Sequence, residues 1–186
     1  MNTPIDISNV TLKTNRLILR PWRQSDLDDF YEYAHVDGVG QMAGWLPHKD
    51  KTESQTILDM FISEKKTFAI EYEGKVIGSL GIENYNEDFF PELAKYKGRE
   101  IGCALSKDYW GQGLMPEAVA EVIRYLFKDC GLDFVTYLYF LHNRQSARVQ
   151  EKCGFHFVKA VKYTTRYGKI EDSNANILWK KDWAAR

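Results

Sequence analysis

One stretch of the sequence limits the fold more than any other: a long amphipathic helix followed directly by a buried strand. Apolar residues recur at helical spacing from Met115 to Cys130, with Pro116 in the first turn and Gly131 as a capping residue. The next segment, Phe134–Leu141, is almost wholly apolar, which is typical of a strand buried on both faces. A sheet that contains such a strand needs helices on its faces, so the sequence predicts an α/β fold.

The rest of the chain supplies a mixed sheet with flanking helices. Further strands are predicted at Arg16–Arg20, Thr67–Tyr72, Lys75–Ile82, Arg99–Leu105, Phe157–Arg166 and Asn176–Lys180. Further helices are predicted after a capping-box-like start at Ser25, at Glu53–Ser63 and at Arg144–Cys153, and irregular segments at Asp37–Lys51 and Asn84–Lys97. No repeat or linker interrupts this order, so we expect one domain over residues 1–186.

Composition narrows the class of protein. The chain has 25 Lys and Arg against 26 Asp and Glu, which does not favour a general nucleic-acid binder. Its three cysteines form no disulfide framework, and the isolated pair Cys153 and His156 does not make a metal site. No apolar run approaches the roughly 18 residues of a membrane span, and the N-terminus does not resemble a secretory signal. We therefore expect a cytoplasmic protein without a metal, a membrane or a nucleic acid as partner.

Two motifs could carry chemistry. The segment Tyr109–Ala118, which contains Trp-Gly-Gln-Gly-Leu-Met-Pro-Glu, lies between a strand and the strongest helix. Glycines there would leave backbone N–H groups uncovered next to a helix N-terminus, which is a geometry that accepts a pyrophosphate. A plain strand-to-helix turn would have the same composition, and the segment is not a P-loop because it lacks the lysine of that motif.

The second motif, Asn143–Phe155, directly follows the buried strand. Arg144, Arg148 and Lys152 are spaced at four residues and share a helix face that could meet phosphates. The alternative is a solvated basic face on which Asn143 serves as a helix cap.

Together the two motifs resemble the GNAT superfamily of acetyl-CoA-dependent N-acetyltransferases. The opening Thr14–Trp22 is similar to the ribosomal-protein acetyltransferase branch of that superfamily, the Rim group. The resemblance covers the chain from about Leu12 onward. It implies a largely antiparallel central sheet that is splayed between two parallel strands, here Arg99–Leu105 and Phe134–Leu141, with acetyl-CoA in the gap as cosubstrate.

The resemblance also implies which residues contact acetyl-CoA. Backbone groups of Cys103, Ala104 and Leu105 are expected to bind the pantetheine arm from one side and Asn143 from the other. Pyrophosphate binding is expected at Gly111, Gln112, Gly113, Leu114 and Met115, with Arg148 nearby on the basic helix face. Trp110 and Met115 depart from the first and last positions of the phosphate signature, so Met115 must point away from the phosphates.

Catalysis by direct attack of an amine on the thioester needs a base and an oxyanion donor. Glu100 is the first candidate base and Glu83 the second, because both lie on or near strands that border the acceptor side. The backbone N–H of Leu105 is the candidate donor to the oxyanion. Each glutamate could instead be an ordinary exposed strand residue.

The thiolate leaving group needs an acid. Gln150 stands where many relatives have a tyrosine, and an amide cannot donate a proton in this way. Ser146 is the favoured substitute because Rim-like sequences have a serine at this spacing, whereas Tyr139 or water remain alternatives.

The acceptor is not identified by the sequence. A protein N-terminus is favoured by the Rim-like opening, and polyamines, aminoglycosides and amino acids also fit an amine acceptor. Aromatic residues of the Trp45 loop and of Tyr85–Phe90 are the expected specificity elements. An acyl-CoA-binding regulatory module and a nucleotide-binding regulatory domain remain alternative functions, and the chain could be a monomer or a homodimer.

Overall fold

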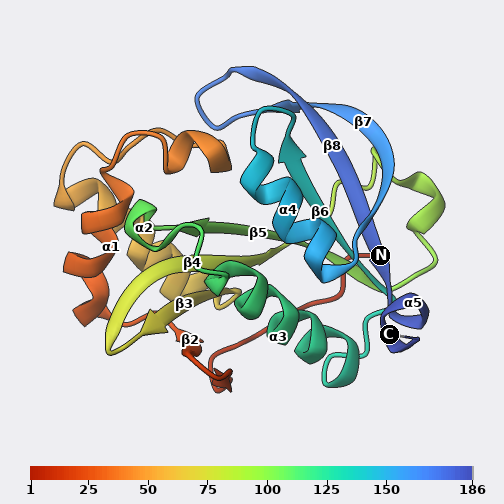
Figure 1. The fold of residues 1–186 in the computed structure, drawn as a ribbon, viewed down its shortest axis with the longest axis horizontal. Coiled ribbons are helices and arrows are strands. Elements are labelled where there is room, and N and C mark those ends of the chain that lie inside the picture. The colour runs from red at the N-terminus through yellow and green to blue at the C-terminus, as the bar shows by residue number, and fades with distance from the viewer. Residues whose placement is uncertain (186) are drawn as a thin grey trace.

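The sheet at the centre of the molecule has eight strands in the order β1-β2-β3-β4-β5-β6-β8-β7 (Figure 1). This computed structural model describes residues 1–185. Its strands are β1 (Leu12–Lys13), β2 (Leu17–Pro21), β3 (Thr67–Tyr72), β4 (Lys75–Glu83), β5 (Gly98–Leu105), β6 (Phe134–Phe140), β7 (His156–Thr164) and β8 (Ile170–Trp179). Neighbouring strands are antiparallel except β5 and β6, which are parallel. The predicted mixed, largely antiparallel sheet with one parallel pair is thus confirmed.

Helices cover both faces of the sheet. They are α1 (Leu27–Ala34), α2 (Lys51–Glu64), α3 (Leu114–Lys128), α4 (Arg144–Cys153) and α5 (Lys180–Ala184). Short 3-10 turns lie at Gln24–Asp26, Gly40–Ala43 (η2), Pro91–Leu93 and Lys107–Tyr109. No helix among residues 1–185 is long and apolar enough to cross a membrane.

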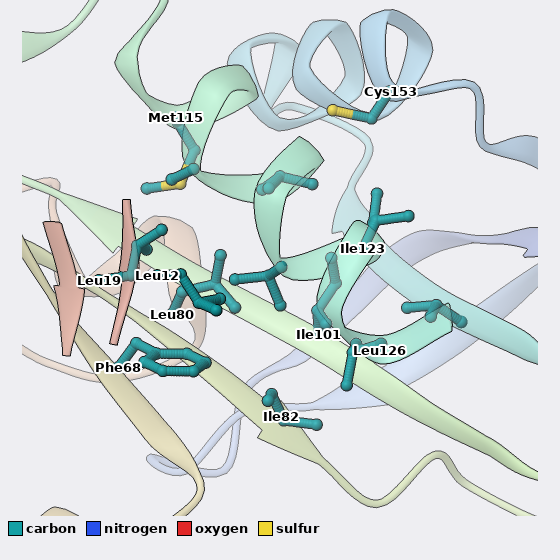
Figure 2. Close-up of a cluster of buried hydrophobic side chains, with 14 of the residues drawn as sticks. Leu12, Leu19, Phe68, Leu80, Ile82, Ile101, Met115, Ile123, Leu126 and Cys153 are labelled. Atoms are coloured by element: carbon teal, nitrogen blue, oxygen red, sulfur yellow. The ribbon is translucent and has the colours of Figure 1, made fainter. Parts of the chain in front are cut away.

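Successive side chains of a strand point to opposite faces of the sheet, so the hydrophobic core is divided between these two faces. On β3, Phe68 and Ile70 pack with α3, whereas Ala69 between them packs with α1 and α2. This follows from the period of two residues, which sends successive side chains to opposite faces. Figure 2 shows the α3 side of the core, where Ile123 and Leu126 of α3 lie over the strand residues.

The parallel pair opens partway along its length. β5 and β6 are paired only from Gly98 and Phe134 to Ile101 and Tyr137. Beyond this point β5 stays paired with β4 as far as Leu105, and β6 stays paired with β8 as far as Phe140. The two strands therefore diverge, and each stays paired within its own half of the sheet. This is the splayed parallel pair that the sequence predicted.

Some local predictions were wrong at their boundaries. Ser25 does not cap α1, because the carboxylate of Asp26 accepts the Arg23 N–H at 2.8 Å and holds a 3-10 turn ahead of the helix. The same carboxylate accepts hydrogen bonds from both terminal guanidinium nitrogens of Arg20, at 2.8 and 2.9 Å. β8 begins at Ile170 rather than Asn176, since pairing with β7 on one edge and β6 on the other extends it through polar residues. The short helix α5 was not predicted.

The start of β5 depends on a glycine. The ring of Phe134 lies against Gly98, so that an added Cβ would be 2.1 Å from the Phe134 Cζ. Gly98→Ala should therefore lower the free energy of unfolding by about 1–3 kcal/mol, because the ring must shift within a packed core. Gly102→Ala is the matched control on the same strand, where a Cβ meets nothing within 4 Å. Urea denaturation measures both, and equal stability of the two variants would contradict the proposed clash.

Candidate functional site

The divergence of β5 and β6 opens into a cavity of about 510 Å³. Twelve of the thirteen residues that the sequence nominated for catalysis or cofactor binding line it: Glu83, Glu100, Cys103, Ala104, Leu105, Gly111, Gly113, Leu114, Met115, Asn143, Ser146 and Arg148. Gln112 is the exception, because its side chain turns back to donate to the Asp108 carbonyl at 3.0 Å. The fold thus gathers nearly all the nominated residues around one space.

One wall of the cavity is a strand edge without a neighbouring strand. The Ser106 N–H donates to the Ile77 carbonyl of β4 at 2.8 Å. Because backbone groups of successive strand residues point to opposite edges, those of Leu105 and Cys103 face the gap. The Leu105 carbonyl already accepts the Trp110 indole N–H at 2.8 Å, whereas its N–H remains directed into the cavity. Buried backbone groups need partners, so this edge suits a ligand with amide groups.

A second wall is the glycine loop in front of α3. Gly111 and Gly113 have left-handed φ angles of 78° and 76°, and Gly113 is the N-cap residue of α3 without a side-chain cap. A Cβ added at Gly111 would meet nothing within 4 Å, so the approach to the backbone is open. Met115 points into the core, as Figure 2 shows, and only 7% of it is exposed. The loop therefore presents N–H groups without obstruction by the methionine.

The N-terminal strand region holds this loop in place. The carboxylate of Glu117 in α3 accepts from the Arg16 guanidinium at 2.8 Å and from the Thr14 hydroxyl at 2.5 Å. Arg16 also donates to the Gln112 carbonyl at 3.0 Å. Gln112 therefore contributes to the loop through its backbone.

The α4 end of the cavity contains Asn143 and two basic side chains. The Asn143 side-chain oxygen accepts the Ser146 N–H at 3.0 Å and so caps α4, which confirms the capping alternative. Its amide nitrogen donates to the Met42 carbonyl of η2 at 3.1 Å. Arg148 and Lys152 line the cavity, whereas Arg144 does not. Two of the three predicted basic residues are thus placed to meet an anionic ligand.

Glu100 has the electrostatic properties of a general base. Burial raises the pKa of its carboxyl to about 8, a hydrogen bond from Thr136 at 3.5 Å lowers it, and the charge of Glu83 raises it. Glu83 is half-exposed and forms an ion pair with Lys66 at 2.7 Å. The two candidates thus differ in burial and in ion pairing, and a carboxyl with a pKa near the working pH is well suited to proton transfer.

Ser146 is fixed from both sides by hydrogen bonds. The Gln150 amide donates to the Ser146 hydroxyl at 3.2 Å, and the Asn176 amide donates to Gln150 at 2.9 Å. The Tyr137 hydroxyl bonds to both Ser146 and the thiol of Cys103. Burial raises the pKa of Tyr137 well above its usual range, so it remains protonated. Gln150 is fully buried outside the cavity lining and positions the serine instead of facing the site.

Only some of the aromatic residues that were expected beside the acceptor line the cavity. Trp45 lines the cavity, as expected for its loop. Tyr85 and Phe90 do not, because both are buried in a core cluster in which Tyr85 contacts Phe134 and Phe90 contacts Tyr85. The expectation that Tyr85–Phe90 forms an acceptor surface is therefore wrong for these two rings.

Sequence reasoning missed residues from the end of β7. Tyr163 and Arg166 line the cavity although they are distant in sequence from both motifs. Nothing in the local pattern could have revealed them, because the segment reads as an ordinary strand and turn. Within residues 1–185, no group of three His, Cys, Asp or Glu side chains could hold a metal ion.

The sequence matches a known protein family. Residues 16–156 match the family model described as "Acetyltransferase (GNAT) domain". The chain therefore belongs to the GNAT acetyltransferase family. The chain is 28% identical over 177 residues to "Uncharacterized N-acetyltransferase YoaA" of Bacillus subtilis, covering 91% of this chain and 96% of the relative.

Solved structures share the fold at low sequence identity. A GNAT-family acetyltransferase from Bacillus anthracis has a TM-score of 0.79 and 18% identity, covering 92% of this chain and 99% of that chain. A ribosomal-protein-S5-alanine acetyltransferase from Vibrio fischeri has a TM-score of 0.71 and 22% identity over 94% of this chain and 99% of that chain. The microcin C7 self-immunity acetyltransferase MccE, solved with acetyl-CoA and AMP, has a TM-score of 0.72 and 17% identity, covering 89% of this chain and 93% of that chain.

The raised pKa of Glu100 predicts a pH-dependent effect on stability. Between the ordinary pKa of 4.5 and about 8, the unfolded chain has lost the proton that the folded chain keeps, so wild-type stability falls as pH rises. Glu100→Gln removes this loss. Its free energy of unfolding should therefore exceed that of the wild type by an amount that grows from near pH 5 to pH 8, reaching about 2 kcal/mol.

Urea denaturation at several pH values measures the difference. The matched control is Glu151→Gln, a change of an exposed glutamate on α4, which should show no such trend. A constant difference between Glu100→Gln and the wild type across this range would contradict the raised pKa.

Proposed function

We propose that the protein is an acetyl-CoA-dependent N-acetyltransferase that acetylates a primary amine by direct attack on the thioester. The observation that carries this proposal is the open edge of β5 beside the cavity, with the N–H of Leu105 directed into it. Family membership supports acetyl transfer, and the acetyl-CoA complex of one structural neighbour supports the cosubstrate.

The residues of the cavity fit acetyl-CoA. Backbone groups of Cys103 and Leu105 can pair with the two amides of the pantetheine arm, in the manner of an added strand. The uncapped N-terminus of α3 behind Gly113 suits the pyrophosphate, since its N–H groups and helix dipole favour an anion. Arg148 and Lys152 add positive charge on the same cavity. Bound there, acetyl-CoA supplies an activated acetyl group.

The chemistry divides among three groups of this chain. Glu100 accepts the proton that the amine loses as its nitrogen bonds to the acetyl carbon. The Leu105 N–H stabilises the negative charge that develops on the carbonyl oxygen. Ser146 donates a proton toward the sulfur when the carbon–sulfur bond breaks, and Gln150 keeps its hydroxyl oriented.

We further propose the N-terminal α-amine of a protein, such as a ribosomal protein, as acceptor. The Rim-like opening and the S5-alanine acetyltransferase neighbour support it. The charge around the acceptor side supports it over polyamines and aminoglycosides, because the carboxylate of Glu83 is already paired with Lys66. We expect the whole chain to form this one domain and to act in the cytoplasm.

A CoA-release assay across four acceptor classes tests the reaction: protein N-termini, polyamines, aminoglycosides and amino acids. Glu100→Gln and Ser146→Ala should each lower kcat by about 10²-fold or more while the KM for acetyl-CoA changes little. Glu151→Gln serves as control. No CoA release with any class would favour the binding-module alternative, and near wild-type turnover by both variants would overturn the assigned roles.

Acetyl-CoA binding at the glycine loop has its own test. Gly111 and Gly74 have φ angles of 78° and 82°, and at both an added Cβ meets nothing within 4 Å. Alanine at either position therefore introduces similar backbone strain, but only Gly111 lines the cavity. Gly111→Ala should weaken acetyl-CoA binding about tenfold in calorimetry, and Gly74→Ala should not. Equal affinity of the two variants would place the phosphates elsewhere.

A further inference from the structure

Arg166 connects the cavity to a second, smaller one. It lines both the main cavity and an adjoining space of about 260 Å³. The two spaces also share Trp45, Phe61 and Ser79. An elongated acceptor could therefore extend from Glu100 past two aromatic rings to this guanidinium.

The backbone of Arg166 is held firmly although its side chain is exposed. Its N–H donates to the Gly44 carbonyl at 2.9 Å, which ties the turn after β7 to the segment that follows η2. Figure 1 shows this turn extending from β7 and β8 toward the N-terminal helices. Thr165 is buried, and its hydroxyl accepts the Lys169 N–H at 2.9 Å. The backbone that carries the Arg166 side chain is thus anchored at the edge of the cavity.

The charge of Arg166 is not compensated. Within residues 1–185 it forms no ion pair. Glu53 lines the second cavity and keeps its negative charge, but it forms no ion pair with Arg166, and one of its oxygens accepts the Lys49 N–H at 2.8 Å. His48 adds no charge at neutral pH, because burial lowers its pKa. A free guanidinium facing a partly enclosed space is a site for a carboxylate, which it can bind through two parallel hydrogen bonds.

Tyr163 lines the main cavity within electrostatic reach of both Glu100 and Arg166. Burial raises the pKa of its hydroxyl, the charge of Glu100 raises it further, and the charge of Arg166 lowers it. Both groups are therefore within electrostatic reach of the same ring. The same cavity thus holds a carboxyl that can accept the amine proton and a cation that can bind an acid.

We propose that the acceptor carries a carboxylate, which Arg166 binds while the amine lies at Glu100. This inference rests on the proposed transferase function and specifies its acceptor. The carboxylate could belong to a free amino acid or to an acidic side chain close to the N-terminus of a peptide. A polyamine would instead place positive charge against Arg166.

Matched acceptors test the proposal and distinguish the two sources. The pairs are phenylalanine with phenylalanine amide, and an Ala-Glu peptide amide with its Ala-Gln counterpart. In at least one pair, the wild type should use the carboxylate member with a kcat/KM about tenfold higher or more. Arg166→Gln should abolish that preference, and Arg166→Lys should keep part of it. Lys162→Gln, a change of a nearby cation on β7 outside both cavities, should leave it unchanged.

The binding of products supplies a readout that does not need turnover. The N-acetylated carboxylate product should bind the wild type about tenfold more tightly than Arg166→Gln in calorimetry, whereas acetyl-CoA should bind both equally. Turnover of neutral amines without any carboxylate preference would overturn this inference and leave the transferase function standing. A preference that persists in Arg166→Gln would also overturn it. Absence of turnover with every acceptor would overturn both.

Discussion

The structure depends on one interruption of hydrogen bonding, the loss of pairing between β5 and β6 after Ile101 and Tyr137. Up to that point the strands are held together, with Phe134 packed on Gly98 at the start of the pair. Beyond it, each strand remains bonded to its other neighbour, so the sheet divides without unfolding. The backbone groups that would have joined the two strands are left for a ligand. The helix α3 connects the strands, and the N-terminus of α3 is consequently brought to the mouth of the gap.

Burial gives the same region its chemical character. A carboxyl in the wall of a narrow gap loses hydration, which disfavours its charged form. Burial therefore raises the pKa of Glu100 to about 8. Its neighbour Glu83 is half-exposed and forms an ion pair with Lys66. Two glutamates that face each other across β4 and β5 therefore lie in different surroundings. The buried carboxyl of Glu100, with its raised pKa, lowers the stability of the folded chain at neutral pH.

The network around Ser146 shows how the fold adapts to Gln150 at a position that often holds a tyrosine. The glutamine is fully buried, and its amide connects Asn176 of β8 to the serine hydroxyl. Tyr137 reaches the same hydroxyl from β6. A fixed serine with buried partners can serve as a proton donor without a tyrosine on α4. The turn after β7, in the same half of the sheet, contributes Arg166, which lines the same cavity.

The sequence by itself determined most of the elements and the glycine loop before α3, because these depend on local patterns. Each of these features can be read from a few neighbouring residues. They are the helical spacing from Met115 to Cys130, the apolar run that begins at Phe134, and the glycines at 111 and 113. Tertiary structure alone decided the rest. The pKa of Glu100 comes from the burial created by other strands, the core positions of Tyr85 and Phe90 come from packing in the cluster that contains Phe134, and Arg166 enters the site because its backbone bonds to Gly44. Burial and contacts between distant segments have no local signature, so no reading of neighbouring residues could have supplied them.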